Sequence, residues 1–205
     1  VRQHIWDTID EIITNYDVDA IHFDDYFYND LPHSQDDGTR NKPGYNPKGL
    51  SKADWRREQV NILVKGIHDL IEEHNTKNNK SVQFGISPAP MWAPSTDVCT
   101  SNGRVGGISG SKYNDPIPCW GYYTYVDLFA DTRKWVLEEW IDYIVPQNYF
   151  ELERNHRSIT EWWVNLVRGT NVKLYMGLGA HNQGANSAWD QNQMKKQLTF
   201  NNQFE

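Results

Sequence analysis

Two adjacent carboxylates, Asp24 and Asp25, are the residues of this chain best placed to do chemistry. They directly follow residues 20–23, a short apolar pattern typical of a buried parallel strand. The loop at the carboxyl end of such a strand is where α/β proteins place ligands and catalytic groups. When two carboxyl groups share a site, the pKa of one rises, so the pair can offer a charged group beside a protonated acid.

Helices and strands that would position this acidic pair, Asp24 and Asp25, alternate along the chain. Apolar residues at helical spacing predict helices over 1–16, from Ser51 onward, and over 127–140, 158–168 and about 187–200. Strand-like segments occupy 19–23, 81–88, 142–150 and 173–179, and long loops occupy 29–50 and 89–125. Four strands, each followed by one of four helices, predict an α/β fold with a parallel sheet and right-handed crossovers.

Three local signals predict where helices begin and end. Ser51 stands three residues before Asp54, which is an N-cap pattern. The segment 158–161 reads Ser-Ile-Thr-Glu, a capping box that predicts a helix start at Ser158. Gly169 follows the same helix and predicts its end.

The carboxyl ends of parallel strands meet at one edge of the sheet, which we call the rim. Side chains that follow the four predicted strands should therefore converge there, and they are Asp24, Asp25, Ser87, Gln147, Tyr149 and His181. This convergence is the main physical argument for a single active site.

Composition excludes several classes of protein. With 205 residues, of which 38% are hydrophobic, the chain can bury one sizeable core, and we expect residues 1–205 to form one domain. A net charge of -7 argues against neutralising nucleic-acid phosphates. No apolar run reaches about 18 residues, so no membrane span is expected. Any export signal would lie upstream of Val1.

Metal and cofactor sites are not expected. Acidic residues between Asp24 and Asp37 lack the spacing of a recognised calcium loop, and Gly103–Gly110 lacks the ending of a phosphate-binding loop. Cys99 and Cys119 either form a disulfide, which would fit an oxidising compartment, or are two separate thiols. Both readings remain open.

Five sequence blocks resemble the signature blocks of the glycosyl hydrolase-like 10 family. They are His22–Tyr28, Trp55–Glu58, Phe84–Pro88, Ala130–Trp135 and Asp142–Tyr149. The resemblance implies a (β/α)8 TIM-type barrel in bacterial proteins that are usually exported or lipid-anchored and that act on peptidoglycan-type glycans. It also implies that this chain corresponds to the second half of such a barrel, an incomplete barrel with about four parallel strands and flanking helices.

Glycoside cleavage needs one carboxylate that attacks, or activates water, and one protonated carboxyl group. Asp24 is our candidate for the first role, and residues 19–24 are also similar to the nucleophile-bearing strand of amylase-like barrels. Asp25 is the candidate acid, although it could equally cap a turn or orient an arginine. Glu151 and Glu153, just beyond the third predicted strand, are rival acids.

Several side chains could bind sugar. His22 should point to the same side as Asp24, and Gln147 and Tyr149 should share one face of their strand. Ser87 and His181 complete the predicted rim. Aromatic residues that could stack on sugar rings are Tyr26, Tyr28, Trp92, Trp120 and Phe150. For each ring taken singly, packing in the core or a loop is the alternative.

Two functions are consistent with these features. The first is a glycoside hydrolase that cleaves O-glycosidic bonds of bacterial cell-wall or related polysaccharide by carboxylate chemistry, without a cofactor. The second is a non-catalytic, carbohydrate-binding surface module on the same scaffold. Either would be extracytoplasmic, with an oligo- or polysaccharide as partner and with room for a lipid anchor upstream. Pairing of two chains into a homo-oligomer is a further alternative.

Overall fold

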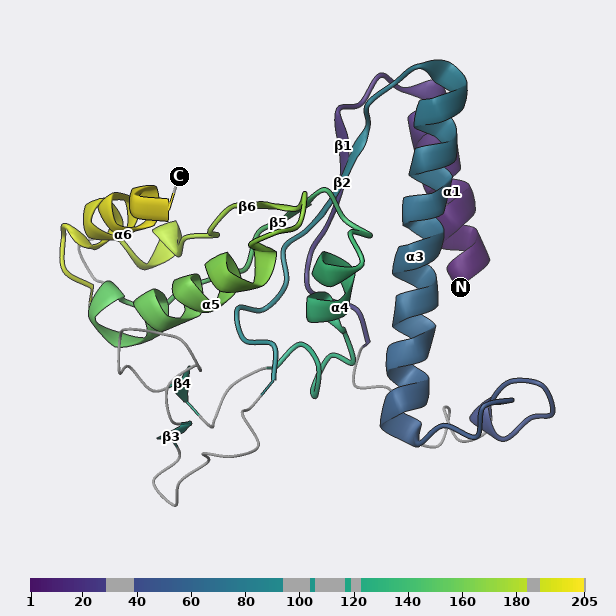
Figure 1. Ribbon diagram of the computed structural model, residues 1–205, viewed down its shortest axis with the longest axis horizontal. Coiled ribbons are helices and arrows are strands. Elements are labelled where there is room, and N and C mark those ends of the chain that lie inside the picture. The colour runs from purple at the N-terminus through teal and green to yellow at the C-terminus, as the bar shows by residue number, and fades with distance from the viewer. Residues whose placement is uncertain (29–38, 94–103, 106–116, 119–122, 184–188, 205) are drawn as a thin grey trace.

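The computed structural model describes residues 1–28, 39–93, 104–105, 117–118, 123–183 and 189–204, with only the backbone of the two short pieces. Its framework is a four-stranded parallel sheet in the order β1-β2-β5-β6 (Figure 1). The strands are β1 (Ala20–Phe23), β2 (Gln83–Ile86), β5 (Tyr143–Ile144) and β6 (Lys173–Leu174). This part of the chain is therefore α/β with parallel strands and flanking helices, as predicted for part of a TIM barrel.

Helices connect and flank the strands. They are α1 (Arg2–Asn15), α3 (Lys52–Asn78), α4 (Thr132–Leu137), α5 (Arg157–Val167) and α6 (Gln193–Asn201). Short helical turns cover η1 (Leu152–His156), η2 (Ala180–Asn182) and η3 (Asn202–Phe204). Helices α1 and α3 lie side by side (Figure 1), and a Cβ at Gly66 would collide with the Trp6 ring, so glycine is what permits this close approach. None of the described helices is long and apolar enough to span a bilayer.

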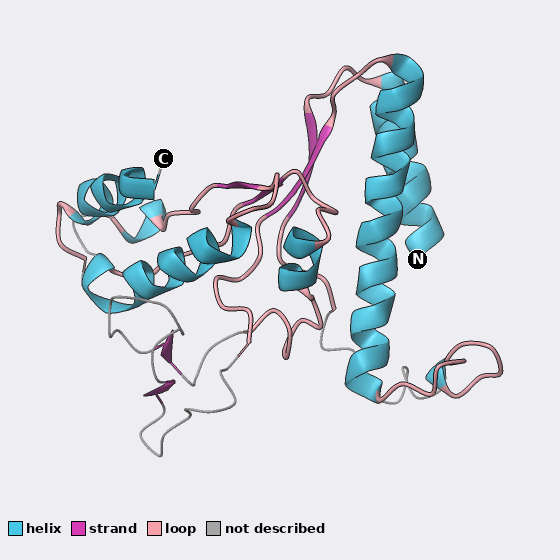
Figure 2. Ribbon diagram, in the orientation of Figure 1, coloured by secondary structure: helices cyan, strands magenta, loops and turns pink. Residues whose placement is uncertain are grey.

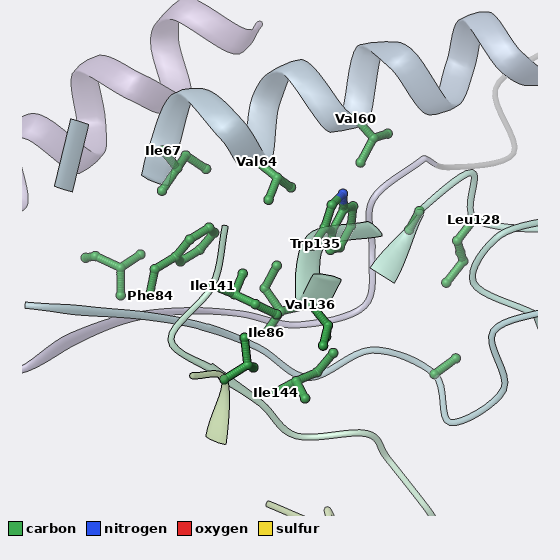
Figure 3. Packing of buried hydrophobic residues seen from close by; sticks show 14 of the residues in the cluster. Val60, Val64, Ile67, Phe84, Ile86, Leu128, Trp135, Val136, Ile141 and Ile144 are labelled. Atoms are coloured by element: carbon green, nitrogen blue, oxygen red, sulfur yellow. The ribbon is translucent and has the colours of Figure 1, made fainter. Parts of the chain in front are cut away.

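The core lies between one face of the sheet and the helices. Figure 3 shows Val60, Val64 and Ile67 of α3 above Phe84 and Ile86 of β2. On α4, Trp135 is fully buried and its indole N–H donates to Asn61 Oδ1 at 2.7 Å, so its polar atom is satisfied inside the core. Burial of these side chains stabilises the fold by roughly 1.5–3 kcal/mol for each large apolar residue.

The other face of the sheet carries polar and aromatic side chains. Because successive strand residues point to opposite faces, His22 on β1 and Tyr143 on β5 face away from the core. Tyr175, just after β6, is 54% exposed on the same face. Its ring lies edge-on to the Tyr143 ring, with 6.1 Å between the ring centroids. The helices thus cover one face, and the chemistry-bearing residues lie on the other.

Two of the three predicted helix boundaries are confirmed. The Ser51 side chain accepts the backbone N–H of Asp54 at 3.1 Å at the start of α3, and Gly169, with φ of +87°, follows the end of α5. The capping box was wrong. Ser158 is fully buried inside α5, because the helix begins at Arg157 and continues a π-helical turn that starts at Leu152.

The helix predicted over 127–140 is also shorter, since α4 spans only Thr132–Leu137. Left-handed backbone at Phe129 (φ 52°) and at Glu139 (φ 53°) prevents helical continuation on both sides, and Asp131 caps the start by accepting from the Lys134 N–H. The last helix begins at Gln193 instead of about 187, although residues 184–188 lie outside the described part of the chain.

Predicted strands end earlier than expected (Figure 2). The segment 142–150 keeps only Tyr143–Ile144 as strand, because the Asn148 and Tyr149 N–H groups turn back to Pro146 and Gln147 carbonyls. Within the loop predicted over 89–125, β3 (Arg104–Val105) pairs antiparallel with β4 (Ile117–Pro118). Cys99, Cys119 and Trp120 lie outside the described residues, so the predictions made for them stay predictions.

Glycine at position 85 allows the uncovered face to pack. Gly85 stands between His22 and Tyr143 in the sheet register, and a Cβ there would overlap the Tyr143 ring. The missing side chain thus lets this ring lie flat over β2 and reach His22, whose Nδ1 is 3.1 Å from the Tyr143 hydroxyl.

We therefore expect Gly85→Ala to destabilise the protein by about 1–3 kcal/mol, because the Tyr143 ring must move. Urea unfolding measures this cost. In a Tyr143→Ala background the same substitution should cost little, and an undiminished cost there would contradict the explanation.

Candidate active site

The acidic pair lies at the carboxyl end of β1, as predicted. Asp24 is exposed, and its Oδ1 accepts the side-chain Nε2–H of Gln147 at 2.7 Å and the backbone N–H of Asp25 at 2.9 Å. Two donors on one oxygen hold the carboxylate in a defined orientation. A carboxylate that acts on a substrate has to be accessible and oriented, and Asp24 is both.

Gln147 links three strand ends. Its Nε2 also donates to the Ser87 carbonyl at 2.9 Å, so both amide hydrogens are used, one toward the residue after β1 and one toward the residue after β2. The Gln147 backbone N–H donates to the Pro88 carbonyl at 3.0 Å, and Gln147 forms an isolated bridge with Gly177 beyond β6. The predicted convergence of Asp24, Ser87 and Gln147 at one edge is therefore present. The side-chain amide of Gln147, which was predicted to bind sugar, donates to a carboxylate of the protein.

Asp25 differs from Asp24 in its surroundings. Partial burial raises the pKa of Asp25, and so do the negative charge of Asp24 and a hydrogen bond with the Asp24 carboxyl group, while a backbone hydrogen bond opposes this effect. These causes disfavour the charged form of Asp25. Asp24, by contrast, is exposed and held by two hydrogen-bond donors, so the two acids differ in their surroundings.

Tyr149 follows Gln147 in the segment after β5, close enough to the acidic pair for both charges to affect its phenol. Partial burial raises the pKa of the Tyr149 phenol, and the negative charges of Asp24 and Asp25 raise it further. The phenol is thus a proton-bearing hydrogen-bond donor at neutral pH. His181, in η2, places its ring edge-on to Tyr149 with 5.2 Å between ring centroids. The structure brings these two predicted rim residues together.

His22 lies on the same strand face, two residues before Asp24. Its Nε2 is 2.9 Å from Ser87 Oγ and its Nδ1 is 3.1 Å from the Tyr143 hydroxyl, so both ring nitrogens have partners. The His22 and Tyr143 rings are stacked, with an interplanar angle of 17°. Ser87 thus contributes its hydroxyl to His22 and its carbonyl to Gln147.

The predicted stacking residues lie in different environments. Tyr26 is 79% exposed just past the acidic pair. Tyr28 packs edge-on against Phe129, and the Arg56 guanidinium lies 5.1 Å from its ring centroid. The Trp92 ring is stacked near Trp162 and packs against Tyr125, and its indole N–H donates to Asp131 at 3.2 Å. These contacts match the packing alternative for Tyr28 and Trp92, and sugar stacking by any of the three stays a prediction.

The rival acids are both engaged by cations. Glu151 forms an ion pair with Arg154 Nε at 2.8 Å, and Glu153 forms one with Lys196 at 3.2 Å. Neither is among the groups that alter the pKa of Asp25 or Tyr149. Among the described residues, no cluster of three or more His, Cys, Asp or Glu side chains could hold a metal ion.

Behind the rim, a buried polar network holds the segment after β5, and sequence reasoning missed it. Fully buried Asn148 donates to the His156 carbonyl at 3.0 Å and to Thr160 Oγ1 at 3.2 Å, and Gln197 of α6 donates to the Phe150 carbonyl at 2.8 Å. The only sequence signal was polar residues at helical spacing on α6, which normally indicates a solvated face.

His156 is the titratable member of this network. It is fully buried, with Nδ1 3.3 Å from the Asn148 carbonyl and Nε2 3.1 Å from the side-chain oxygen of Asn201. Burial lowers the pKa of His156, and its hydrogen bonds only partly oppose this effect. A neutral imidazole thus helps to anchor the backbone that presents Gln147 and Tyr149.

Comparison with known proteins shows the family of this chain. The model of the family described as Glycosyl hydrolase-like 10 matches residues 1–195. The chain belongs to this family. It is 34% identical over 212 residues to Glycosyl hydrolase YngK of Bacillus subtilis (strain 168), covering 100% of this chain and 38% of YngK. It is 31% identical over 215 residues to Glycosyl hydrolase DigH of Escherichia coli (strain K12), covering 98% of this chain and 44% of DigH.

Membership in the glycosyl hydrolase-like 10 family supports a glycoside-hydrolase type of function and a barrel-type fold. The chain spans less than half the length of the two relatives.

The raised pKa of Asp25 can be tested without a substrate, by measuring the stability of the protein. The raised pKa of Asp25 means that the folded state binds this proton more tightly than the unfolded state, whose value is near 3.8. Stability should therefore fall as pH rises through the folded-state pKa, where ionised Asp25 becomes unfavourable. We expect Asp25→Asn to be more stable than the unmodified protein at pH 7, by at most about 1 kcal/mol because the group is partly exposed.

Urea unfolding between pH 3 and pH 8 measures this difference, which should vanish below the unfolded-state value. Asp19→Asn is the matched control, because Asp19 is exposed just before β1, at the opposite end of this strand from Asp25. A difference for Asp25→Asn that does not depend on pH would show that Asp25 is not in a charge-disfavouring environment.

Proposed function

We propose that this chain carries the catalytic acids of a glycoside hydrolase that cleaves O-glycosidic bonds in bacterial cell-wall, peptidoglycan-type, or related polysaccharide. The observation that carries the proposal is the exposed Asp24 carboxylate, oriented by Gln147 and adjacent to Asp25, whose pKa is raised. Family membership supplies the reaction class.

The two acids would divide the chemistry. Asp25, favoured in its protonated form, gives a proton to the departing glycosidic oxygen, and charged Asp24 stabilises or activates the group that attacks the anomeric carbon. Tyr149 adds a neutral donor beside both acids, where sugar hydroxyl or carbonyl oxygens would bind. This chemistry requires no cofactor.

The substrate determines where such an enzyme works. Peptidoglycan-type glycans lie outside the cytoplasmic membrane, so we propose an extracytoplasmic location, at the cell surface or in the periplasm, for the protein that contains this chain. Its partner is then an oligo- or polysaccharide. Assembly into a homo-oligomer stays a separate prediction, which light scattering would measure.

Replacing Asp24 tests the proposal. In the natural full-length protein, Asp24→Asn should lower the rate of hydrolysis of purified cell-wall glycan strands by about 10²–10⁴-fold, because the charge is lost while the shape is kept. Release of reducing ends measures the rate. Asp19→Asn should leave this rate unchanged, since Asp19 lies at the other end of β1.

Binding measurements separate this enzyme from a carbohydrate-binding module. If the unmodified protein binds the glycan strands but releases no reducing ends, the chain belongs to a binding module and the proposed activity is wrong. Hydrolysis that is equally fast with Asp24→Asn would instead remove Asp24 from the mechanism.

A further inference from the structure

A buried glycine at the rim brings a tryptophan ring close to Tyr149. Gly179 lies in the segment that follows β6. A Cβ at this position would stand 3.1 Å from Cη2 of Trp189 and 3.2 Å from Cβ of Tyr149. The tip of the Trp189 indole therefore lies over the bare backbone of Gly179, beside Tyr149.

The close approach, and not the backbone conformation, is what favours glycine at position 179. Gly179 has a φ of -78°, which any residue can adopt. A side chain there would have to displace the Trp189 ring, Tyr149 or the side-chain amide of Asn182, whose Nδ2 would be 3.0 Å from the added Cβ. The missing side chain thus sets where the indole lies.

The aromatic rings adjoin the residue that orients Asp24. Gln147 donates to the Asp24 carboxylate at 2.7 Å, and it forms a bridge with Gly177, two residues before Gly179. Tyr149 stands two residues after Gln147, and the ring of His181 lies edge-on to the Tyr149 ring with 5.2 Å between centroids. The strand ends that hold the carboxylate therefore also hold the rings.

These rings keep part of their surface open to solvent. Tyr149 is 39% exposed, His181 is exposed and Trp189 is partly exposed. Amphipathic rings of this kind offer an apolar surface together with hydrogen-bonding atoms at the edge. Ligand sites are typically built from such rings and a few oriented polar groups, and the oriented carboxylate of Asp24 supplies one here.

We propose that Trp189 is a substrate-binding residue of this site, and that its indole stacks on the apolar face of a sugar unit bound beside Asp24. Tyr149 and His181 complete the subsite and offer hydrogen bonds to the hydroxyl groups of the same sugar. Gly179 is a positioning residue, because it acts only through the place that it leaves for the indole. This inference rests on the proposed function and adds a residue that holds the substrate.

Removing the indole tests the role of Trp189. In the natural full-length protein, Trp189→Ala should raise KM for soluble cell-wall glycan strands by about 10-fold and change kcat by less than about threefold, because stacking holds the sugar before and during the reaction alike. Trp189→Phe should raise KM less, since it keeps a ring. Trp140→Phe is the matched control and should leave KM unchanged, because Trp140 is also partly exposed but precedes β5, at the opposite end of the sheet.

The positioning role of Gly179 has its own test. Gly179→Ala should raise KM by about threefold, because the added methyl group displaces the indole. The same substitution in a Trp189→Ala background should add no further increase. An undiminished increase in that background would show that Gly179 does not act through Trp189, and would overturn this part of the inference.

Calorimetric binding separates the subsite from the glycosidase function. The same strands are titrated into Asp24→Asn protein with and without Trp189→Ala, and the second substitution should weaken binding about as much as it raises KM. Unchanged KM and Kd would show that the indole only packs, which overturns the subsite and leaves the glycosidase function standing. Weakened binding, in a protein whose unmodified form cleaves no strands, would overturn the glycosidase function and leave the subsite standing. Absence of both binding and cleavage would overturn both.

Discussion

The side-chain amide of Gln147 is the contact on which the geometry of the site depends. It gives one hydrogen to the Asp24 carboxylate at 2.7 Å and the other to the Ser87 carbonyl at 2.9 Å. A side-chain carboxylate is stabilised by hydrogen-bond donors, and here one of them comes from a neighbouring strand end. Because the donor is neutral, it orients Asp24 without neutralising the charge that raises the pKa of Asp25.

This contact is possible because one face of the sheet packs in the core and the other face carries polar side chains. Ile21, Phe84, Ile86 and Ile144 point toward the helices and build the core, as Figure 3 shows for three of them. The intervening residues are free to be polar, and the small volume of Gly85 allows the Tyr143 ring to cross β2. Stability and chemistry thus come from alternate positions of the same short strands.

The segment after β5 shows how an irregular backbone is kept in place. Its regular strand ends at Ile144 and only an isolated bridge at Gln147 follows, yet it must present Gln147 and Tyr149 accurately. Asn148, between them, points the opposite way and is tied to η1 and α5, while Gln197 of α6 holds the Phe150 carbonyl. The side-chain N–H groups of Asn148 and Gln197 are used in these hydrogen bonds, whereas their side-chain oxygens are buried without a hydrogen-bond partner among the described residues. The acidic pair therefore relies on elements well separated from it in sequence.

The sequence by itself determined the order of strands and helices, the Ser51 cap, the Gly169 helix end and the placement of the acidic pair at a strand end, because these follow from local periodicity and turn chemistry. It misplaced the start of α5 and the ends of α4, where left-handed Phe129 and Glu139 and the π-helical turn depend on their surroundings. Only the tertiary structure decided that Gln147 binds Asp24, that Asp25 is partly buried so that its pKa is raised, and that His156 is fully buried so that its pKa is lowered. These are contacts between distant segments or effects of burial, and no local pattern in a sequence encodes the distance between two side chains.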